Sequence, residues 1–371
     1  MKIGIDARLV HYQPAGIGQY TVRLAEALAA IDTENTYVIL QSRKDTTPLV
    51  DNAVVRRRSM LTPPHHRFEQ WTLPLELHAL GLDLLHSPDF IPPFRRPCRS
   101  VITVHDLAFL RFPGLMTGES QNYYSQINHA VRSANHIIAV SESTKRDLVS
   151  LVGADERKIT CVYEAAGPQF RPAGAAAITS VRQRYGLMGD YLLFVSTIEP
   201  RKNIPFLLQA YARMRETWPQ GSEPPRLVLA GHKGWLYESI FAMRDELHLG
   251  DAVLCTGGVA VEDLPALYSG ARAFVLPSLY EGFGLPVLEA MSCGAPVITS
   301  NTSSLPEVAG DAAILVSPQD LYGLAAAMQR LSLDEGLRMQ MSVRGAAQAA
   351  RFSWERAARE TLAVYRAAST M

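Results

Sequence analysis

Short, almost wholly apolar segments alternate with longer segments of helical periodicity along nearly the whole chain. In the first half, the apolar segments read as strands at 2–6 ("KIGID"), 36–41 ("TYVILQ") and 101–106 ("VITVHD"). In the second half, the corresponding segments span 191–197, 226–231, 252–258, 271–278, 295–300 and 312–318. Apolar strands separated by helical patterns are typical of parallel sheets that are covered on both faces. The alternation therefore predicts an α/β fold.

The length of 371 residues suits two domains of about 150 residues each. The segment 163–177 ("YEAAGPQFRPAGAAA") is rich in Gly, Pro and Ala and interrupts the alternation, which "DYLLFVST" then restarts. We therefore expect a first doubly wound domain over 1–168 and a second over 169–352. The remaining residues, 353–371, are expected to form a terminal helix.

That terminal helix begins with "SWERAARETLAVYRAA". Ser353 is a suitable N-cap, and Leu362 and Tyr365 fall on one helical face. The sequence therefore predicts an amphipathic helix that packs through this face.

Composition excludes several classes of protein. The 36 basic and 36 acidic residues balance, which argues against a nucleic-acid-binding protein with a basic body. The sequence contains no run of about 18 apolar residues, which is the length needed to span a membrane. The apolar segment at its start is too short for a signal peptide. The four cysteines are far apart and lack zinc-site spacing, so we expect reduced, structural cysteines in a cytoplasmic protein.

Ligands of open α/β sheets bind outside the carboxyl ends of the strands, so the residues after each strand are the informative ones. Arg201 and Lys202 follow the strand at 191–197 and precede a helix. A guanidinium and an ammonium beside free helix N–H groups suit a diphosphate, and Glu199 can orient them. The alternative is a solvated basic pair, which the helix dipole would disfavour.

The segment 278–299 ("SLYEGFGLPVLEAMSCGAPVIT") places two carboxylates around a glycine turn. Glu281 falls in the loop, and Glu289 falls about one turn inside the helix that follows. They share no helical face, which argues against a hydrolase dyad, and a carboxylate can instead accept hydrogen bonds from a diol. The alternative is a surface loop with solvated acids. Backbone N–H groups at the helix start come from Phe283, Gly284 and Leu285.

Five further positions in three parts of the chain give weaker signals. Gly16 and Gly18 precede a helix and would let the backbone approach a ligand, or they simply form a tight turn. His105 follows a strand and could contact a sugar hydroxyl or a phosphate, or it could be a buried core histidine. Val259 and Leu264 could border a nucleotide base, or belong to ordinary loop packing.

Three segments together resemble the retaining family 4 glycosyltransferases of GT-B fold. They are "GIGQY" at 16–20, "EPRKN" at 199–203 and "YEGFGLPVLEAMSCGAPVITS" at 280–300, and the resemblance extends over nearly the whole chain. It implies two facing Rossmann-like domains with an interdomain cleft. It also implies that the N-terminal domain binds the acceptor, the C-terminal domain binds a nucleotide sugar, and the terminal helix crosses back to the N-terminal domain.

The resemblance also implies roles for the residues named above. Arg201 and Lys202 would hold the diphosphate, and Glu289 would accept the ribose hydroxyls. Glu281 and the backbone of 283–285 would hold the donor sugar. From the N-terminal domain, Gly16 and Gly18 would close over the diphosphate, and His105 would lie beside the donor sugar.

The donor and the mechanism are further expectations from the resemblance. "STIEPRKN" at 196–203 and "AGHKGWLYE" at 230–238 resemble mannosyltransferases of bacterial polysaccharide assembly. We therefore expect GDP-mannose as the donor, with UDP-glucose or another UDP-sugar as the alternative. A front-face reaction that retains the anomeric configuration is expected. The chain has no D-x-D triplet, so we expect neither a divalent metal nor another cofactor.

The acceptor is expected to be a hydroxyl of a glycan or lipid-linked glycan, bound near 54–77. Arg56, Arg57 and Arg58, with Phe68 and Trp71, could rest on an anionic membrane surface, and the alternative without membrane contact is equally open.

Other classes fit the sequence less well. A nicotinamide oxidoreductase would need a G-x-G-x-x-G turn and an acid after the second strand, where "QSRK" stands instead. A phosphorylase would need a pyridoxal lysine, and nothing singles one out. A non-catalytic sugar-binding module would not need a diphosphate clamp.

Overall fold

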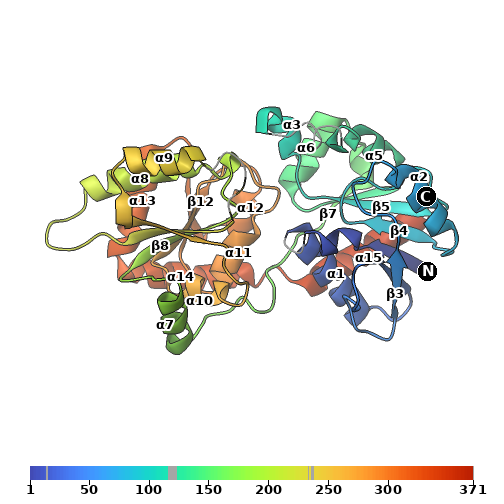
Figure 1. Cartoon of the computed structure of the whole chain (residues 1–371), viewed down its shortest axis with the longest axis horizontal. Helices are drawn as coiled ribbons and strands as arrows, with labels where there is room; N and C mark the ends of the chain where they lie inside the picture. The colour runs from blue at the N-terminus through green and yellow to red at the C-terminus, as the bar shows by residue number, and fades with distance from the viewer. Residues whose placement is uncertain (14–15, 116–122, 233, 235–237, 371) are drawn as a thin grey trace. The chain divides into compact units, whose positions relative to one another are not determined.

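A computed structural model of the chain describes residues 1–13, 16–115, 123–232, 234 and 238–370. It divides into two compact units, each built on its own parallel sheet (Figure 1). Met1–Glu164 and Ser353–Met371 form the first unit, and Ala165–Phe352 form the second. The chain therefore leaves the first unit within the Gly/Pro/Ala-rich segment and returns to it at its end.

The first unit contains a seven-stranded sheet of order β3-β2-β1-β4-β5-β6-β7, in which neighbouring strands pair in parallel. Its strands are β1 (Lys2–Asp6), β2 (Thr36–Ser42), β3 (Val55–Met60), β4 (Leu84–Ser87), β5 (Arg99–Val104), β6 (His136–Ala139) and β7 (Ile159–Cys161). Its α-helices are α1 (Ile17–Ile31), α2 (Glu69–His78), α3 (Ala108–Arg111), α5 (Ile127–Ser133), α6 (Glu142–Val152) and α15 (Trp354–Thr370). Short 3₁₀ helices are η1 (Arg8–His11), η2 (Pro113–Leu115) and η3 (Glu156–Lys158).

The second unit contains a six-stranded sheet of order β10-β9-β8-β11-β12-β13, again with parallel pairing. Its strands are β8 (Tyr191–Val195), β9 (Arg226–Ala230), β10 (Val253–Gly257), β11 (Ala273–Leu276), β12 (Val297–Ser300) and β13 (Ala313–Val316). Its α-helices are α7 (Ala175–Arg184), α8 (Ile204–Glu216), α9 (Glu238–Glu246), α10 (Leu264–Ser269), α11 (Leu285–Ser292), α12 (Leu305–Ala309), α13 (Leu321–Leu333) and α14 (Glu335–Ala349). Short 3₁₀ helices are η4 (Pro200–Lys202) and η5 (Gly250–Ala252).

These sheets confirm the predicted α/β class, and burial explains why the strands are so apolar. Strand β8 is buried along almost its full length, and β11 and β12 are buried throughout. Helices cover the faces of both sheets (Figure 1). Polar side chains are therefore concentrated at strand ends, where the chain leaves the sheet.

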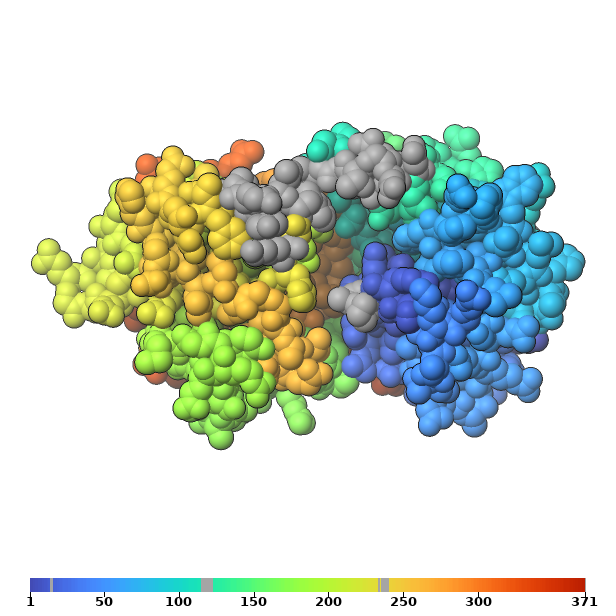
Figure 2. Space-filling model, viewed as in Figure 1, coloured from blue at the N-terminus to red at the C-terminus, as the bar shows by residue number. Residues whose placement is uncertain are grey.

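Helix α15 completes the core of the first unit, although it comes from the end of the chain. The backbone N–H of Arg356 donates to Ser353 Oγ at 3.1 Å, which confirms the predicted N-cap. Leu362 and Tyr365 are buried in the same apolar cluster as residues of β1 and α1. Blue atoms from the N-terminal part of the chain cover most of the visible side of this unit, and little of the red helix shows there (Figure 2).

A polar chain crosses this apolar core. The hydroxyl of Tyr365 lies 2.7 Å from His86 Nδ1, and His86 Nε2 lies 2.8 Å from Thr103 Oγ1. The hydroxyl of Tyr20 lies 3.0 Å from the same Thr103 oxygen. Burial lowers the pKa of His86 to about 3, so this imidazole is neutral. The side-chain polar atoms of this hydrogen-bonded row are thus paired with one another without a charge.

Candidate functional site in the second unit

The strand order of the second sheet reverses between β8 and β11. In a doubly wound sheet, the connections from two such strands leave in opposite directions, so the carboxyl edge between them stays uncovered. Strand β8 leads into η4, which carries Arg201 and Lys202, and β11 leads into the loop that carries Ser278 and Glu281. The topology thus brings together residues that are about 80 positions apart in the sequence.

These residues form one ion-pair cluster. Lys202 Nζ lies 2.7 Å from Glu281 Oε1, and Arg201 Nη1 lies 3.3 Å from Glu281 Oε2. Arg201 also donates to Glu199 Oε1 at 2.9 Å and to the carbonyl oxygen of Tyr280 at 3.0 Å. Lys202 and Glu281 are each only 7% exposed. Two cations and two carboxylates therefore balance at this strand edge.

Glu281 is held in its ionised form. Burial alone would raise the pKa of this carboxyl, but Lys202 and Arg201 outweigh burial and hold the pKa below its usual range. The hydroxyl of Ser278 donates to Glu281 Oε1 at 2.7 Å and favours the same form. The carboxylate is therefore charged, oriented and shared between two cations.

The glycine turn after Glu281 is fixed by two serines. The N–H of Glu281 donates to Ser303 Oγ at 2.9 Å, and Ser304 Oγ donates to the carbonyl oxygens of Glu281 and Phe283 at 2.9 and 2.8 Å. Gly284 adopts a φ of 102°, and a Cβ there would lie 2.8 Å from Leu305. This position therefore requires glycine.

Helix α11 begins at Leu285, as predicted, and within the described residues no side chain caps its start. Within its first turn, Pro286 has no N–H, and the N–H of Val287 donates to the carbonyl oxygen of Gly284 at 2.9 Å. Phe283 is buried and packs edge-on against Phe352, with ring centroids 5.9 Å apart.

Glu289 lies in α11, and its environment differs from that of Glu281. The hydroxyl of Tyr268, from α10, donates to Glu289 Oε2 at 3.0 Å. Burial raises the pKa of Glu289 to about 7, although the tyrosine hydrogen bond opposes the rise. Of the two glutamates that bracket the glycine turn, Glu281 therefore has a lowered pKa, and Glu289 titrates near neutral pH.

The predicted base-contacting residues are half-buried and lie after β10. Val259 belongs to the loop that follows this strand, and Leu264 is the first residue of α10. The loop is fixed at Asp263, whose carboxylate accepts from Arg184 Nη1 at 2.7 Å and from the Tyr185 hydroxyl at 2.8 Å. Of the neighbouring "HKGW" segment, residues 233 and 235 lie outside the described residues.

The other predicted residues belong to the first unit. Gly16 has a φ of 56° and directly precedes α1. A Cβ at Gly18 would lie 2.1 Å from the carbonyl oxygen of Gln13, so this position also requires glycine. The structure shows close backbone packing at Gly18, and this packing explains the residue without a ligand.

His105 makes hydrogen bonds within the first unit. Its Nδ1 lies 2.9 Å from Glu164 Oε1, and its Nε2 lies 3.0 Å from the carbonyl oxygen of Pro88. Both partners are acceptors, so the ring satisfies both only as an imidazolium. Burial would lower the pKa of His105, but Glu164 outweighs burial and raises it. The ring of His105 also lies edge-on to the ring of Tyr20, with centroids 4.7 Å apart.

Sequence reasoning missed the three side chains that hydrogen-bond to Glu289, Glu281 and His105. They are Tyr268, Ser278 and Glu164, respectively. Ser278 lies in the same strand-end segment as Glu281 and could have been found there. Tyr268 and Glu164 contact their partners through packing of separate elements, which leaves no local pattern in the sequence. Within the described residues, no cluster of three or more His, Cys, Asp or Glu could hold a metal ion.

Comparison with known proteins gives a consistent result along the chain. The family described as "Glycosyl transferases group 1" matches residues 181–348, and "Glycosyltransferase Family 4" matches residues 14–166. O-antigen chain mannosyltransferase B of Escherichia coli is 32% identical over 391 aligned positions, which cover 99% of this chain and 100% of that protein.

Two solved structures have the same fold. Sucrose-phosphate synthase from Thermosynechococcus elongatus gives a TM-score of 0.79 at 24% identity and covers 99% of this chain and 98% of its own. Anabaena Alr3699/HepE in complex with UDP-glucose gives 0.76 at 18% identity and covers 100% of both chains. These similarities confirm the expected GT-B fold.

The cluster leads to a prediction about stability. Glu281→Ala leaves buried Lys202 without its carboxylate, so we expect a loss of about 3 kcal/mol in the free energy of unfolding of the second unit. The matched control is Glu216→Ala, which breaks the exposed Arg213–Glu216 pair of α8 and should cost less than about 1 kcal/mol. Urea titration followed by circular dichroism would measure both, and equal losses would contradict the interpretation.

Proposed function

The chain belongs to the glycosyltransferases of group 1 and family 4, and from this premise we propose that it transfers mannose from GDP-mannose to a hydroxyl of a glycan or lipid-linked glycan. The observation that carries the proposal is that half-buried Arg201 and buried Lys202 lie together at the reversal of the second sheet. A cationic pair at that edge matches the diphosphate of a nucleotide sugar. The mannosyl donor is supported by similarity to the mannosyltransferase from Escherichia coli.

In this proposal, the cations are partly shared with the ligand. Arg201 and Lys202 turn from Glu281 and Glu199 toward the diphosphate, and Glu281 is then free to accept hydroxyls of the donor sugar. Glu289 accepts the ribose hydroxyls, and the N–H groups at the start of α11 face the donor sugar. Val259 and Leu264 border the base. Gly16, Gly18 and His105 keep the roles expected from the resemblance.

The proposed reaction retains the anomeric configuration. The bond from the anomeric carbon to the diphosphate oxygen breaks while the acceptor hydroxyl attacks from the same face. The protein contributes by positioning the reactants and by stabilising the charge of the leaving diphosphate. Arg201 and Lys202 can supply this positive charge, so the proposal includes no divalent metal. A UDP-sugar is the second candidate donor, because HepE, which shares the fold, has been solved with UDP-glucose.

A thermal-unfolding series tests the donor. GDP at about 100 times its dissociation constant should stabilise the native protein by about 2.7 kcal/mol and raise the unfolding midpoint. Lys202→Met should abolish the shift, whereas Arg213→Ala, which removes an exposed cation of α8, should keep it. In transfer assays, Lys202→Met should lower turnover at least about a hundredfold.

The nucleotide that raises the unfolding midpoint decides between the candidate functions. A shift with UDP alone would replace GDP-mannose by a UDP-sugar and keep the transferase. A shift with NAD alone, or full turnover of Lys202→Met, would overturn the proposed site.

The raised pKa of Glu289 predicts a pH dependence. Ribose hydroxyls donate more strongly to the ionised carboxylate than to the protonated carboxyl, so donor affinity should fall as the pH drops below about 7, by at most about tenfold per pH unit. Glu289→Gln should have weaker affinity and a flatter profile. The nucleotide sugar is the right probe for calorimetry between about pH 5.5 and pH 8.5, because its phosphates are diesters that do not titrate there. Parallel profiles for the two proteins would contradict the role of Glu289.

We also propose that the first unit rests on the inner, anionic face of the cytoplasmic membrane. Within the described residues, no helix is long and apolar enough to cross a bilayer. However, α2 is apolar on two faces: Leu73 and Leu77 are buried in the core, whereas Trp71 and Leu75 are 71% and 75% exposed. The exposed residues belong to a group that we call the α2 patch, which consists of Leu61, Phe68, Trp71 and Leu75.

Basic groups accompany this patch. The guanidinium of Arg67 lies 4.7 Å from the ring centroid of Phe68. The edge strand β3 exposes Arg56, Arg57 and Arg58. Exposed apolar side chains together with arginines are the chemistry that binds anionic lipid surfaces.

Vesicle binding tests this surface. The double variant Trp71→Ser/Leu75→Ser should bind anionic phospholipid vesicles at least about tenfold more weakly, because two apolar side chains no longer enter the interface. The matched control is Val343→Ser on α14, which is 72% exposed and belongs to the second unit. Equal binding by the double variant and the wild type would contradict the proposal.

A further inference from the structure

The two oxygens of the Glu289 carboxyl group have different surroundings. Oε2 accepts the hydrogen bond from the Tyr268 hydroxyl at 3.0 Å. Oε1 has no donor among the residues that the structure describes, and Glu289 is half-buried rather than enclosed. A carboxylate oxygen accepts hydrogen bonds through its lone pairs, so Oε1 is the oxygen that remains for a ligand.

Tyr268, the donor to Oε2, is itself fixed by packing. Its side chain is fully buried, and its ring lies edge-on to the ring of Phe274 on β11, with centroids 5.4 Å apart. A second edge-on contact, at 6.1 Å, is made by Phe170, which is buried and precedes α7. Aromatic rings favour such edge-on pairs, and a close-packed interior resists their rotation. The direction of the hydroxyl is therefore set by its neighbours.

Helices α10 and α11 are joined a second time directly beside this contact. Ser269, the last residue of α10, donates from Oγ to the carbonyl oxygen of Cys293, which follows α11, at 3.0 Å. The N–H of Ala173 donates to the same Ser269 oxygen at 3.0 Å. Two neighbouring residues of α10 thus hold α11, so the helix pair determines where Tyr268 meets Glu289.

A buried tyrosine hydroxyl does not need a carboxylate as its acceptor. Tyr191 and Tyr211 are also buried in the second unit, and their hydroxyls donate to backbone carbonyl oxygens at 2.7 and 2.8 Å. A carboxylate is the more costly acceptor, because burial penalises its charged form. The need to pair the Tyr268 hydroxyl therefore does not explain Glu289, whereas the need to orient Glu289 explains Tyr268.

We infer that Tyr268 is a positioning residue for ribose recognition, because it holds Oε2 of Glu289 and leaves Oε1 for the ribose hydroxyls of the donor nucleotide. A carboxylate that turned freely about its last torsion would present its oxygens in many directions, whereas a held carboxylate accepts in one geometry. Tyr268 itself does not touch the nucleotide. The inference rests on the proposed function, in which Glu289 accepts the ribose hydroxyls.

Calorimetry with the whole protein tests the inference at about pH 8, where Glu289 is mostly ionised. The probes are GDP and UDP, each compared with its 2′,3′-dideoxy counterpart, which lacks both ribose hydroxyls. The wild type should bind the preferred ribonucleotide at least about tenfold more tightly than the dideoxynucleotide. Tyr268→Phe removes only the hydroxyl and should reduce this preference to less than about threefold. The dissociation constant of the dideoxynucleotide should not change.

The ratio of the two dissociation constants separates positioning from stability. A loss of folded protein, or a loosened site, would weaken both nucleotides alike and leave the ratio unchanged. The matched control is Tyr211→Phe, which removes another buried tyrosine hydroxyl of the second unit, one that is bonded to backbone carbonyl oxygens. This control should keep the preference of the wild type for the ribonucleotide.

The outcomes also separate this inference from the proposed function. If Tyr268→Phe prefers the ribonucleotide as strongly as the wild type does, or if Tyr211→Phe loses the preference to the same extent, the inference is overturned and the transferase proposal stands. If the wild type binds both forms equally, the ribose role of Glu289 fails, and the inference fails with it. A wild type that binds neither nucleotide would overturn the proposed function as well.

Discussion

A parallel sheet whose strand order reverses leaves one stretch of its carboxyl edge uncovered by its own connections, and the rest of this structure depends on that constraint. Each unit has one reversal, between β1 and β4 in the first and between β8 and β11 in the second. Apolar strands force polar side chains to the strand ends, so ionisable groups collect at these two edges. Each cluster has a buried cation, Arg8 in the first unit and Lys202 in the second, and burial makes the pairing of that cation energetically important.

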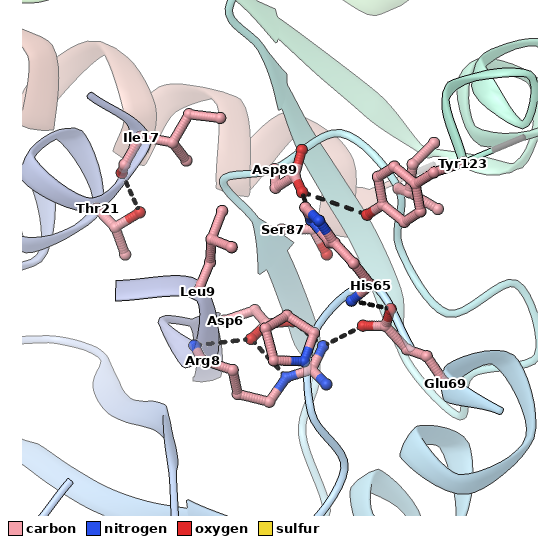
Figure 3. A pocket seen from close by; sticks show the side chains of 12 residues that line it. Asp6, Arg8, Leu9, Ile17, Thr21, His65, Glu69, Ser87, Asp89 and Tyr123 are labelled. Carbon is pink, nitrogen blue, oxygen red and sulfur yellow. Dashed lines mark hydrogen bonds and ion pairs between the residues drawn. The ribbon is translucent and has the colours of Figure 1, made fainter. Parts of the chain in front are cut away.

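The two edges differ in the chemistry that they offer. In the second unit, Lys202 and Arg201 are paired with carboxylates whose hydrogen bonds can be exchanged for those of a diphosphate and a sugar. In the first unit, Arg8 is enclosed by its acceptors, and the unsatisfied atoms belong to Asp89 and Ser87. The second edge therefore carries cations that could attract an anion, whereas the guanidinium at the first edge is already enclosed by its acceptors (Figure 3).

Much of this arrangement could be predicted from the sequence, because it follows from strand ends. The alternation of apolar and helical segments gave the parallel sheets, and the rule about strand ends selected Arg201, Lys202, Glu281 and Glu289. Strand β3 was missed because its "VRRRSM" segment is an exposed edge strand without an apolar run. The hydrogen bond from Tyr268 to Glu289 depends on how α10 packs against α11, and no local pattern records that contact.

The edge of the first sheet shows the same limit more sharply. Asp6 is the last residue of β1, and Asp89 follows β4 closely, so the rule about strand ends applies to them as well. However, Asp89 follows a strand of only four residues, which lacks a distinct signal in the sequence. His65 and Glu69 come from the connection between β3 and α2, and their meeting with Arg8 and Asp89 is set by tertiary packing. Sequence patterns therefore locate the edges of sheets better than the groups that converge on them.

Stability and binding make opposite demands at these edges. Replacing a buried ion pair by apolar side chains of similar volume is often neutral or stabilising, so the Lys202–Glu281 pair gives the fold little that a methionine and a leucine could not. The protonation of Glu289 near neutral pH and the orphaned atoms of Ser87 and Asp89 are likewise costs in the ligand-free protein. A diphosphate bound at the second edge, as we propose, would convert the cost of that edge into binding free energy. On this argument, unfavourable groups in the unbound structure are concentrated where a ligand could relieve them.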